Sequence, residues 1–143
     1  MNRRSLLTLA IAAAVLAPAA ALACDGMHQQ ASFEPRKASV AEVAAWTKAK
    51  AAVPVDANGQ DTRASQGVIP GAVLLTSTSE YALSELPANK ASKLVFYCAS
   101  ERCGASHAAA QRAMMAGYTD VSVLPAGISG WKKAGQPVVK PNS

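Results

Sequence analysis

The stretch KLVFYCASERCGASHAAAQRAMMAGY, residues 93–118, decides the fold of this chain. After the leading lysine, residues 94–97 are apolar, aromatic and β-branched, which predicts a buried strand over residues 93–97 that ends beside Cys98. Five residues later, the segment 104–116 is rich in alanine and free of proline, which favours a helix whose small side chains pack closely on a sheet. We therefore expect a strand, a loop that begins at Cys98, and a helix.

The rest of the chain alternates in the same way. Ser39 and Glu42 have the spacing of a capping box, and they predict a helix of about eleven residues. Strands are expected at residues 53–56, 73–75 and 121–124, and further short helices at residues 77–86 and 127–135. Short apolar strands of this kind are typical of a mostly parallel sheet with helices on both faces. The predicted fold class is α/β, with ligands bound beyond the carboxyl ends of the strands, where Cys98 lies.

Length and composition limit the classes of function. With 143 residues and 50% hydrophobic content, the chain has the size and apolar content of one globular domain. Lys and Arg number 14 against 9 Asp and Glu, and the basic residues form no long cluster. Aromatic residues make up only 5% of the chain. Because both a basic stripe and a stacking platform are missing from the sequence, nucleic-acid binding is not expected.

The first 23 residues have the features of a secretory signal peptide. Arg3 and Arg4 precede an uncharged run at residues 6–22, which closes with the small residues of a cleavage site. The run is interrupted by Pro18 and is shorter than the roughly 20 residues of a spanning helix, which disfavours a membrane anchor. We expect residues 1–23 to be removed and the protein to be exported, periplasmic or secreted, by the general or the twin-arginine route.

The segment after the cleavage site is expected to be a mobile arm. Residues 24–38 are polar and show no period, so the folded domain is expected at residues 39–140. Cleavage leaves Cys24 at the new N-terminus. Lipid attachment, and with it membrane contact, is therefore an open alternative, although the residues before Cys24 depart from the usual lipid-attachment pattern.

A cysteine between a strand and a helix has surroundings that lower the pKa of its thiol. Unpaired loop N–H groups and the positive end of the helix dipole stabilise a thiolate. Cysteines in such settings have pKa values of roughly 3.5–7.5, against about 8.5 for a free thiol. We predict that Cys98 is a nucleophile and that Arg102 adds positive charge. The residues expected to bind an anion beside it are Ala99, Ser100, Glu101, Arg102, Cys103 and Gly104.

Spacing argues against other cysteine chemistries. A phosphatase or arsenate-reductase loop has an arginine six positions after its cysteine, where this chain has Gly104. A thioredoxin-type motif has two residues between its cysteines, whereas four separate Cys98 from Cys103. A metal site at Cys98, Cys103 and His107 lacks an obvious fourth ligand, so neither a metal nor another cofactor is expected.

Three other residues are expected to have structural or neutral roles. Asp56 ends a predicted strand, where a buried carboxylate usually accepts N–H bonds from nearby turns. Trp131 is expected in the core. Arg63 is expected to be a solvated surface charge.

Five segments follow the order of a known family, at residues 53–56 (VPVD), 67–72 (GVIPGA), 96–98 (FYC), 116–124 (AGYTDVSVL) and 126–138 (AGISGWKKAGQPV). With them, the chain from about Ser39 to Val139 resembles a rhodanese domain. The resemblance implies a rhodanese-like α/β domain with five strands, in which Cys98 carries sulfane sulfur as a persulfide. It also implies transfer from a small sulfur-containing anion such as thiosulfate, or from a persulfide, to a thiol or cyanide acceptor.

The loop departs from the family pattern. Val68 stands where the family has a histidine, and Arg102 comes one position early, so that Cys103 occupies the position of the family's arginine. Glu101 adds a negative charge beside the expected anion site. These departures leave the physiological donor open.

Cys103 has three alternative roles. It forms a reversible disulfide with Cys98, it attacks a Cys98 persulfide and releases sulfide, or it packs the start of the helix. The second functional hypothesis is therefore a non-catalytic or redox-responsive module with a Cys98/Cys103 disulfide.

Overall fold

The computed structural model describes residues 33–141. The expected signal peptide, Cys24 and most of the expected arm lie outside the described residues. The described part is built on a five-stranded sheet in the order β1-β5-β4-β2-β3, and every pair of neighbours is parallel. The strands are β1 (Arg36–Lys37), β2 (Val53–Asp56), β3 (Val73–Leu74), β4 (Leu94–Tyr97) and β5 (Val121–Leu124). The predicted α/β fold with a mostly parallel sheet is confirmed.

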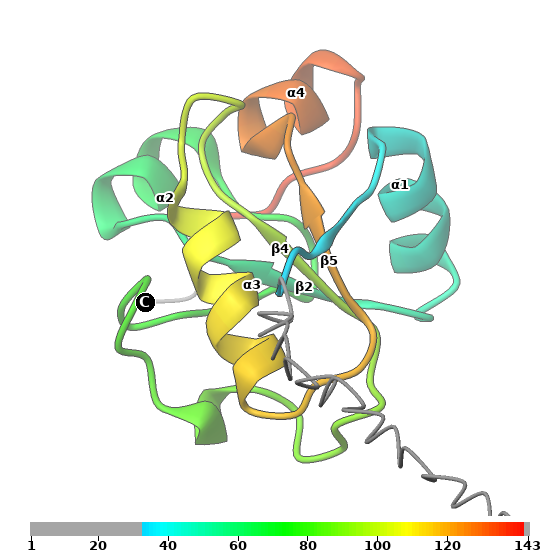
Figure 1. Cartoon of the computed structure of the whole chain (residues 1–143). Coiled ribbons are helices and arrows are strands. Elements are labelled where there is room, and N and C mark those ends of the chain that lie inside the picture. Colours follow the sequence, from blue (N-terminus) through cyan, green and yellow to red (C-terminus); the bar gives the residue numbers. More distant parts are fainter. Residues whose placement is uncertain (1–32, 142–143) are drawn as a thin grey trace, which may run out of the picture. The chain divides into compact units, whose positions relative to one another are not determined.

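Helices cover both faces of this sheet (Figure 1). They are α1 (Val40–Lys48), α2 (Gln60–Gln66), α3 (Ala105–Met115) and α4 (Gly127–Lys133), with a 3₁₀ turn at Leu83–Glu85. Alanines of α3 pack against one face, in a core that includes Phe96 and Val123. Val43 of α1 and Trp131 of α4 pack in a second core on the other face. The small side chains of α3 let it lie close to the strands, as the alanine-rich sequence predicts.

The central strand β4 explains why its sequence is apolar without interruption. All four of its residues are buried. Leu94 and Phe96 belong to the core under α3, whereas Val95 and Tyr97 belong to the core under α1 and α4. A strand that is covered on both faces requires apolar side chains at every position, not at alternate ones.

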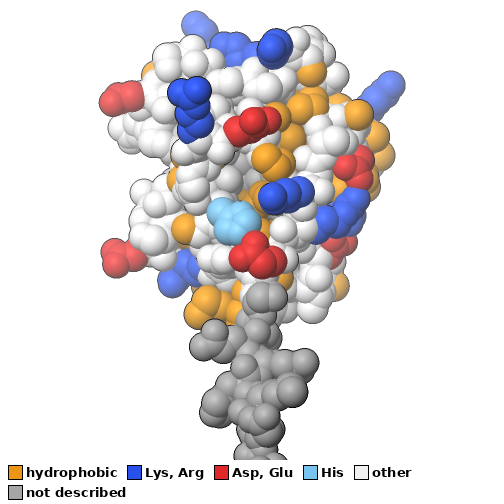
Figure 2. Space-filling view, turned by 45° about the horizontal axis from the view of Figure 1, so that its top comes forward, with side chains coloured by type: hydrophobic (Ala, Val, Ile, Leu, Met, Phe, Trp, Pro, Cys, Tyr) orange, Lys and Arg blue, Asp and Glu red, His pale blue; other side chains and the backbone are white. Residues whose placement is uncertain are grey.

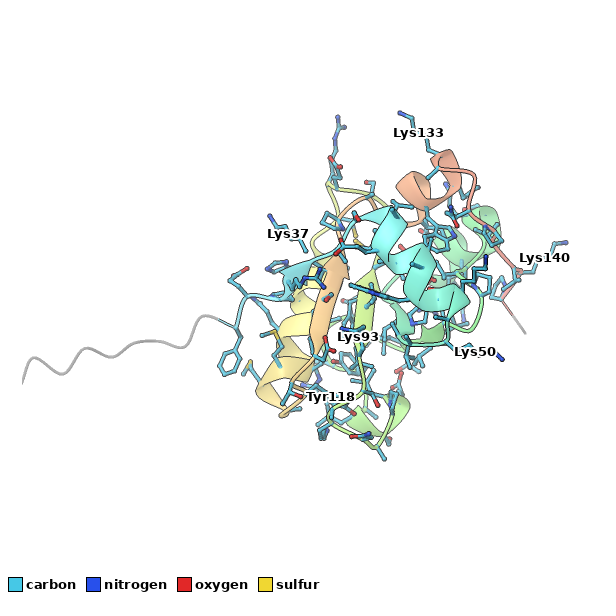
Figure 3. The ribbon with its side chains drawn as sticks, turned by 90° about the vertical axis from the view of Figure 1, so that its right-hand side faces the viewer. Lys37, Lys50, Lys93, Tyr118, Lys133 and Lys140 are labelled. Atoms are coloured by element: carbon cyan, nitrogen blue, oxygen red, sulfur yellow. The ribbon has the colours of Figure 1, made fainter. Side chains whose placement is uncertain are left out.

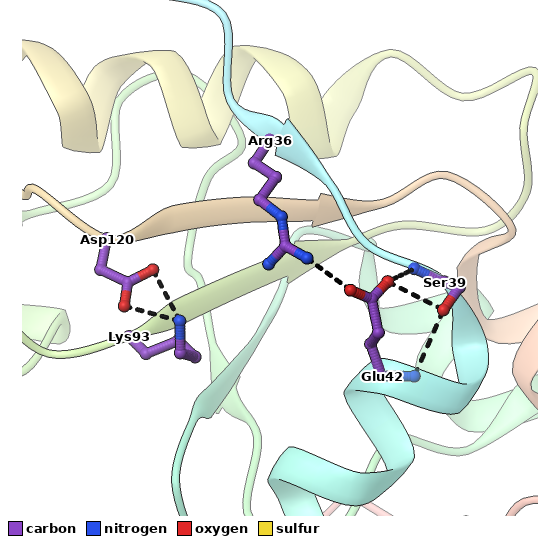
Figure 4. A network of polar contacts seen from close by, with 5 residues as sticks. All are labelled: Arg36, Ser39, Glu42, Lys93 and Asp120. Carbon is purple, nitrogen blue, oxygen red and sulfur yellow. Dashed lines mark hydrogen bonds and ion pairs between the residues drawn. The ribbon is translucent and has the colours of Figure 1, made fainter.

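The start of α1 confirms the predicted capping box. The Glu42 N–H donates to the Ser39 hydroxyl at 3.3 Å, and the Ser39 N–H donates to the Glu42 carboxylate at 2.8 Å (Figure 4). Arg36 forms an ion pair with the same carboxylate. The bond from the Ser39 N–H, together with the Ser39 hydroxyl and Arg36, holds the pKa of Glu42 below its ordinary value. The helix has nine residues, two fewer than expected, and Lys50 turns the chain at a positive φ of 52°.

Ordered structure begins earlier than expected. Arg36 and Lys37 form the edge strand β1, and the Ala38 N–H donates to the Val123 carbonyl at 2.8 Å. Pro35 and Ala38 are buried. The expectation of a mobile arm is therefore wrong for residues 36–38. A two-residue edge strand with exposed basic side chains has no apolar pattern that would indicate it in the sequence.

Two further elements differ from the prediction. Instead of the helix expected at residues 77–86, the structure has only the 3₁₀ turn. The Glu85 carboxylate accepts hydrogen bonds from the Thr76 and Ala82 N–H groups, and these bonds stabilise the segment as a loop. Helix α2 was not expected, because its sequence, QDTRASQ, carries no apolar periodicity.

None of the helices between residues 33 and 141 is both long and apolar enough to span a bilayer. Figure 2 shows basic and acidic side chains scattered over one face, without a large patch of one sign. This distribution agrees with the mixed charges in the sequence.

Candidate active site

Cys98 follows β4 directly and lies at the carboxyl edge of the sheet. Its neighbours across the sheet are the ends of β2 and β5, since Tyr97 is in register with Asp56 and Leu124. The loop that Cys98 begins runs to Gly104, and α3 starts at the next residue. The strand, loop and helix expected from the sequence are therefore present. Cys98 itself is only 1% exposed.

Helix α4 is hydrogen-bonded to the first two residues of this loop. The Ile128 N–H donates to the Cys98 carbonyl at 2.8 Å, and the Ser129 N–H donates to the Ala99 carbonyl at 3.0 Å. These are N–H groups of the first turn of α4, which have no partner within their own helix. Gly127 allows this approach, because a Cβ on it would lie 2.6 Å from the Cys98 carbonyl oxygen. Its φ of +60° also favours glycine.

Acceptor groups lie next to the Cys98 sulfur. Its thiol donates to the Cys103 carbonyl oxygen, 2.9 Å from Sγ, and the Ser100 carbonyl oxygen lies 3.9 Å away. The Ser106 hydroxyl is 3.3 Å from the same sulfur. Burial raises the pKa of the Cys98 thiol and contact with the Cys103 side chain raises it further, against the opposite effect of Ser106. This arrangement favours the protonated form of Cys98.

Donor groups lie next to the Cys103 sulfur. Burial raises the pKa of this thiol, but bonds from the Cys98 thiol and from the N–H groups of Ala99 and Ala105 outweigh burial and bring it below its ordinary value. Cys103 is also partly exposed, unlike Cys98. The Ala99 amide was expected to face Cys98. In the structure it favours a thiolate at Cys103 instead.

A shallow hollow of about 320 Å³ adjoins the loop. It is bounded by loop residues on one side and by α4 on the other. Arg102 and Lys133 supply two positive charges and Glu101 one negative charge among its lining residues. Figure 3 shows the Lys133 side chain extending from the end of α4. The hollow offers a net positive surface beside the loop, and neither Cys98 nor Cys103 is among its lining residues.

Asp56 and Arg63 join the ends of the strands next to Cys98. Asp56 is fully buried and accepts bonds from the Asn58 N–H at 2.7 Å and from Arg63 Nε at 3.2 Å. The guanidinium also donates to the backbone carbonyls of Asp56 and Leu75, at 3.0 and 2.9 Å. The structural role predicted for Asp56 is confirmed. The expectation of a solvated Arg63 is wrong, because its side chain satisfies carbonyls at the ends of β2 and β3.

Two aromatic side chains brace the same region. The Tyr97 hydroxyl accepts the Ile69 N–H at 3.0 Å and so ties β4 to the segment before β3. Trp131 is 1% exposed, and its indole N–H donates to the Pro137 carbonyl at 2.7 Å. The prediction that Trp131 is a core residue is confirmed.

Histidine and acidic groups do not gather around the two thiols. Within residues 33–141, no cluster of three or more His, Cys, Asp or Glu side chains is placed to hold a metal ion. His107, on the first turn of α3, lies 2.9 Å from the Glu34 carboxylate. This contact ties α3 to the segment that precedes β1.

Comparison with known families adds to this geometry. The model of the rhodanese-like domain family matches residues 39–134, which is more than half of the chain. The chain belongs to the rhodanese-like domain family. The sequence resemblance to rhodanese is thereby confirmed. No match is found among curated proteins.

Solved structures share the fold of this rhodanese-like domain. A rhodanese-related protein from Thermoplasma volcanium is 24% identical, over 74% of this chain and 99% of that one, with a TM-score of 0.60. A thiosulfate sulfurtransferase from Pseudomonas aeruginosa is 25% identical, over 76% of this chain but only 21% of that one, with a TM-score of 0.64.

A third similar structure has a different suggested activity. It is a protein of unknown function from Rhodopseudomonas palustris, described as a possible tyrosine phosphatase, and it is 24% identical over 73% of this chain and 85% of that one, with a TM-score of 0.61. At this identity the likeness concerns the fold alone. Gly104 stands where a phosphatase loop has its arginine.

The rhodanese-like loop brings together most of the residues predicted from the sequence. Cys98 and Cys103 are in side-chain contact, and Ser100, Glu101 and Arg102 line the hollow. Sequence reasoning missed Ser106, Gly127 and Lys133. Ser106 lies one helical turn beyond Cys103, a spacing that was available in the sequence. Gly127 and Lys133 are distant in sequence, and only the packing of α4 against the loop brings them to the site.

Proposed function

We propose that this rhodanese-like protein is a sulfurtransferase that carries sulfane sulfur as a persulfide on Cys98. The placement of Cys98 supports the proposal most strongly: a buried thiol at the end of a central strand, in a loop fastened by α4 and followed by a helix. A thiolate in such a loop attacks the outer sulfur of a donor and keeps that sulfur as a persulfide. Burial then shields the persulfide from water and from unwanted thiols.

The hollow between the loop and α4 suits the expected substrates. Arg102 and Lys133 attract small sulfur-containing anions such as thiosulfate, and an anionic acceptor thiol fits the same surface. Glu101 opposes this attraction, so we propose that a persulfide donor competes with thiosulfate. Cyanide is a convenient acceptor for assays. We place the reaction outside the cytoplasm, on the strength of the signal-peptide pattern in residues 1–23.

The contact between the two cysteine side chains favours a second function. Both are free thiols in the structure, and a disulfide between them would block the Cys98 sulfur. In this alternative the domain is a redox-responsive or non-catalytic module, active only when it is reduced.

A mass measurement separates the two functions. The purified protein is reduced, incubated with thiosulfate and weighed intact, before and after addition of cyanide. The sulfurtransferase is expected to gain the mass of one sulfur atom, and cyanide is expected to remove it. Peptide mapping is expected to find this sulfur on Cys98 once loading is complete. Absence of this gain, together with a loss of two hydrogens that reductant reverses, would instead support the disulfide module.

A further inference from the structure

The active-site loop surrounds its two thiols with opposite backbone groups. The Cys98 sulfur faces carbonyl oxygens, at 2.9 Å for Cys103 and 3.9 Å for Ser100. The Cys103 sulfur receives the N–H groups of Ala99 and Ala105. A carbonyl oxygen accepts a thiol proton but repels a thiolate, whereas N–H groups stabilise a thiolate. The loop therefore favours the protonated form at Cys98 and the ionised form at Cys103.

The two thiols also differ in how far they are exposed to solvent. Cys98 is 1% exposed, whereas Cys103, just before the start of α3, is partly exposed. A donor molecule that arrives from solvent reaches Cys103 first. Reactivity with a donor requires both access and a thiolate, and Cys103 has the more exposed sulfur and the lower pKa of the two thiols.

We propose that Cys103 is the thiol that takes sulfur from the donor and that it hands this sulfur to Cys98, so that the loop works as a two-cysteine relay. The relay rests on the proposed sulfurtransferase function and assigns the donor-facing step within it. It differs from a disulfide switch, because no oxidation takes place and the second thiol carries sulfur.

Each step of the relay is an exchange of one sulfur–sulfur bond for another. The Cys103 thiolate attacks the outer sulfur of thiosulfate, the bond between the two sulfur atoms of the donor breaks, and sulfite leaves with the electron pair. Cys98 then attacks the outer sulfur of the Cys103 persulfide and becomes the persulfide, while its proton passes to the Cys103 sulfur. No oxidant or reductant is consumed, and the proton stays within the pair.

Because the two side chains are in contact, the sulfur atom moves only a short distance in the second step. The Cys98 and Cys103 side chains lie within hydrogen-bonding contact of each other. A sulfur–sulfur bond is about 2.0 Å long, so the outer sulfur of a persulfide on one cysteine is within reach of the sulfur of the other.

The sequence supplies a direct way to locate the sulfur. Trypsin cleaves after Arg102, so Cys98 falls on the peptide 94–102 and Cys103 on the peptide 103–112. Cys24 falls on a third peptide that ends at Arg36. The reduced protein is mixed anaerobically with one equivalent of thiosulfate, quenched with iodoacetamide at successive times, digested without reductant and analysed by mass spectrometry. The added sulfur is expected first on peptide 103–112 and later on peptide 94–102.

Two matched variants test the order of the thiols independently. Cys98→Ser is expected to gain one sulfur from thiosulfate, on Cys103, at close to the wild-type rate. Cys103→Ser is expected to gain sulfur about tenfold more slowly, because the remaining thiol is buried and its pKa is raised. If Cys103→Ser loads as fast as wild type and Cys98→Ser takes no sulfur, the relay is wrong, while the sulfurtransferase function stands. If the wild-type protein takes no sulfur from thiosulfate or from a small persulfide, both proposals are overturned.

Discussion

Replacing Gly127 with alanine tests whether α4 sets the position of the active-site loop. A Cβ at residue 127 would lie 2.6 Å from the Cys98 carbonyl oxygen and 2.7 Å from two further backbone atoms, of Ala99 and Ser100. Restoring a separation of 3.0 Å requires the loop to retreat by about 0.4 Å. A positive φ costs alanine about 1–2 kcal/mol, and overpacking typically adds about 1–3 kcal/mol. We therefore expect Gly127→Ala to lose about 2–5 kcal/mol of unfolding free energy.

Gly135→Ala is the matched control for this variant. Gly135, which follows the end of α4, also has a positive φ, 73°, but no atom lies within 4 Å of its would-be Cβ. It is expected to lose only the backbone cost of about 1–2 kcal/mol. Urea unfolding gives the stabilities, and the rate of sulfur gain from thiosulfate gives the effect on the loop. Since misplacing reacting groups by about 1 Å costs on the order of 100-fold, we expect Gly127→Ala to load on the order of tenfold more slowly. Equal stability and equal loading in the two variants would refute the support of the loop by α4.

Three further predictions concern the framework around the site. Ser39→Ala removes the capping hydroxyl of α1 and should cost about 1 kcal/mol in urea unfolding, whereas Ser84→Ala, in an exposed turn without a capping bond, should cost much less. The folded state lowers the pKa of Glu42, so the stability that wild type has over Glu42→Gln should be present above the unfolded pKa of about 4.3 and fade as the pH falls through the lower folded pKa. A difference that grows on acidification would contradict this assignment. Arg63→Met leaves the buried Asp56 carboxylate without its cation and should cost about 3–5 kcal/mol, while a loss below about 1 kcal/mol would show that Arg63 is solvated after all.

Local sequence patterns are sufficient to predict much of the fold. Apolar residues without interruption mark β4, the capping box marks the start of α1, and an alanine-rich segment marks α3. These signals act between residues that are close in the chain, so a single sequence is sufficient to find them. The position of Cys98 at the end of a strand follows from the same patterns, and with it the candidate nucleophile.

Elements without a local signal were missed. Strand β1 has two basic residues and is held by main-chain bonds to β5, about 85 residues later in the chain. Helix α2 has a mostly polar sequence, and its one buried residue is the charged Arg63. The Arg63 guanidinium donates to backbone carbonyls at the ends of two strands. Main-chain pairing and buried charge of this kind depend on partners that are remote in sequence, which no periodicity records.

The surroundings of the two thiols also depend on partners that are remote in the sequence. The sequence alone places Cys98 and Cys103 in one loop and predicts a thiolate there, but it does not say which sulfur meets N–H groups and which meets carbonyls. That choice depends on the path of the loop backbone, which α4 sets through the Ile128 and Ser129 amides and through the missing side chain of Gly127. Residue types and spacing determine which reactive groups the site contains. The directions of the backbone dipoles, which exist only once the helices are packed, raise the pKa of one thiol and lower that of the other.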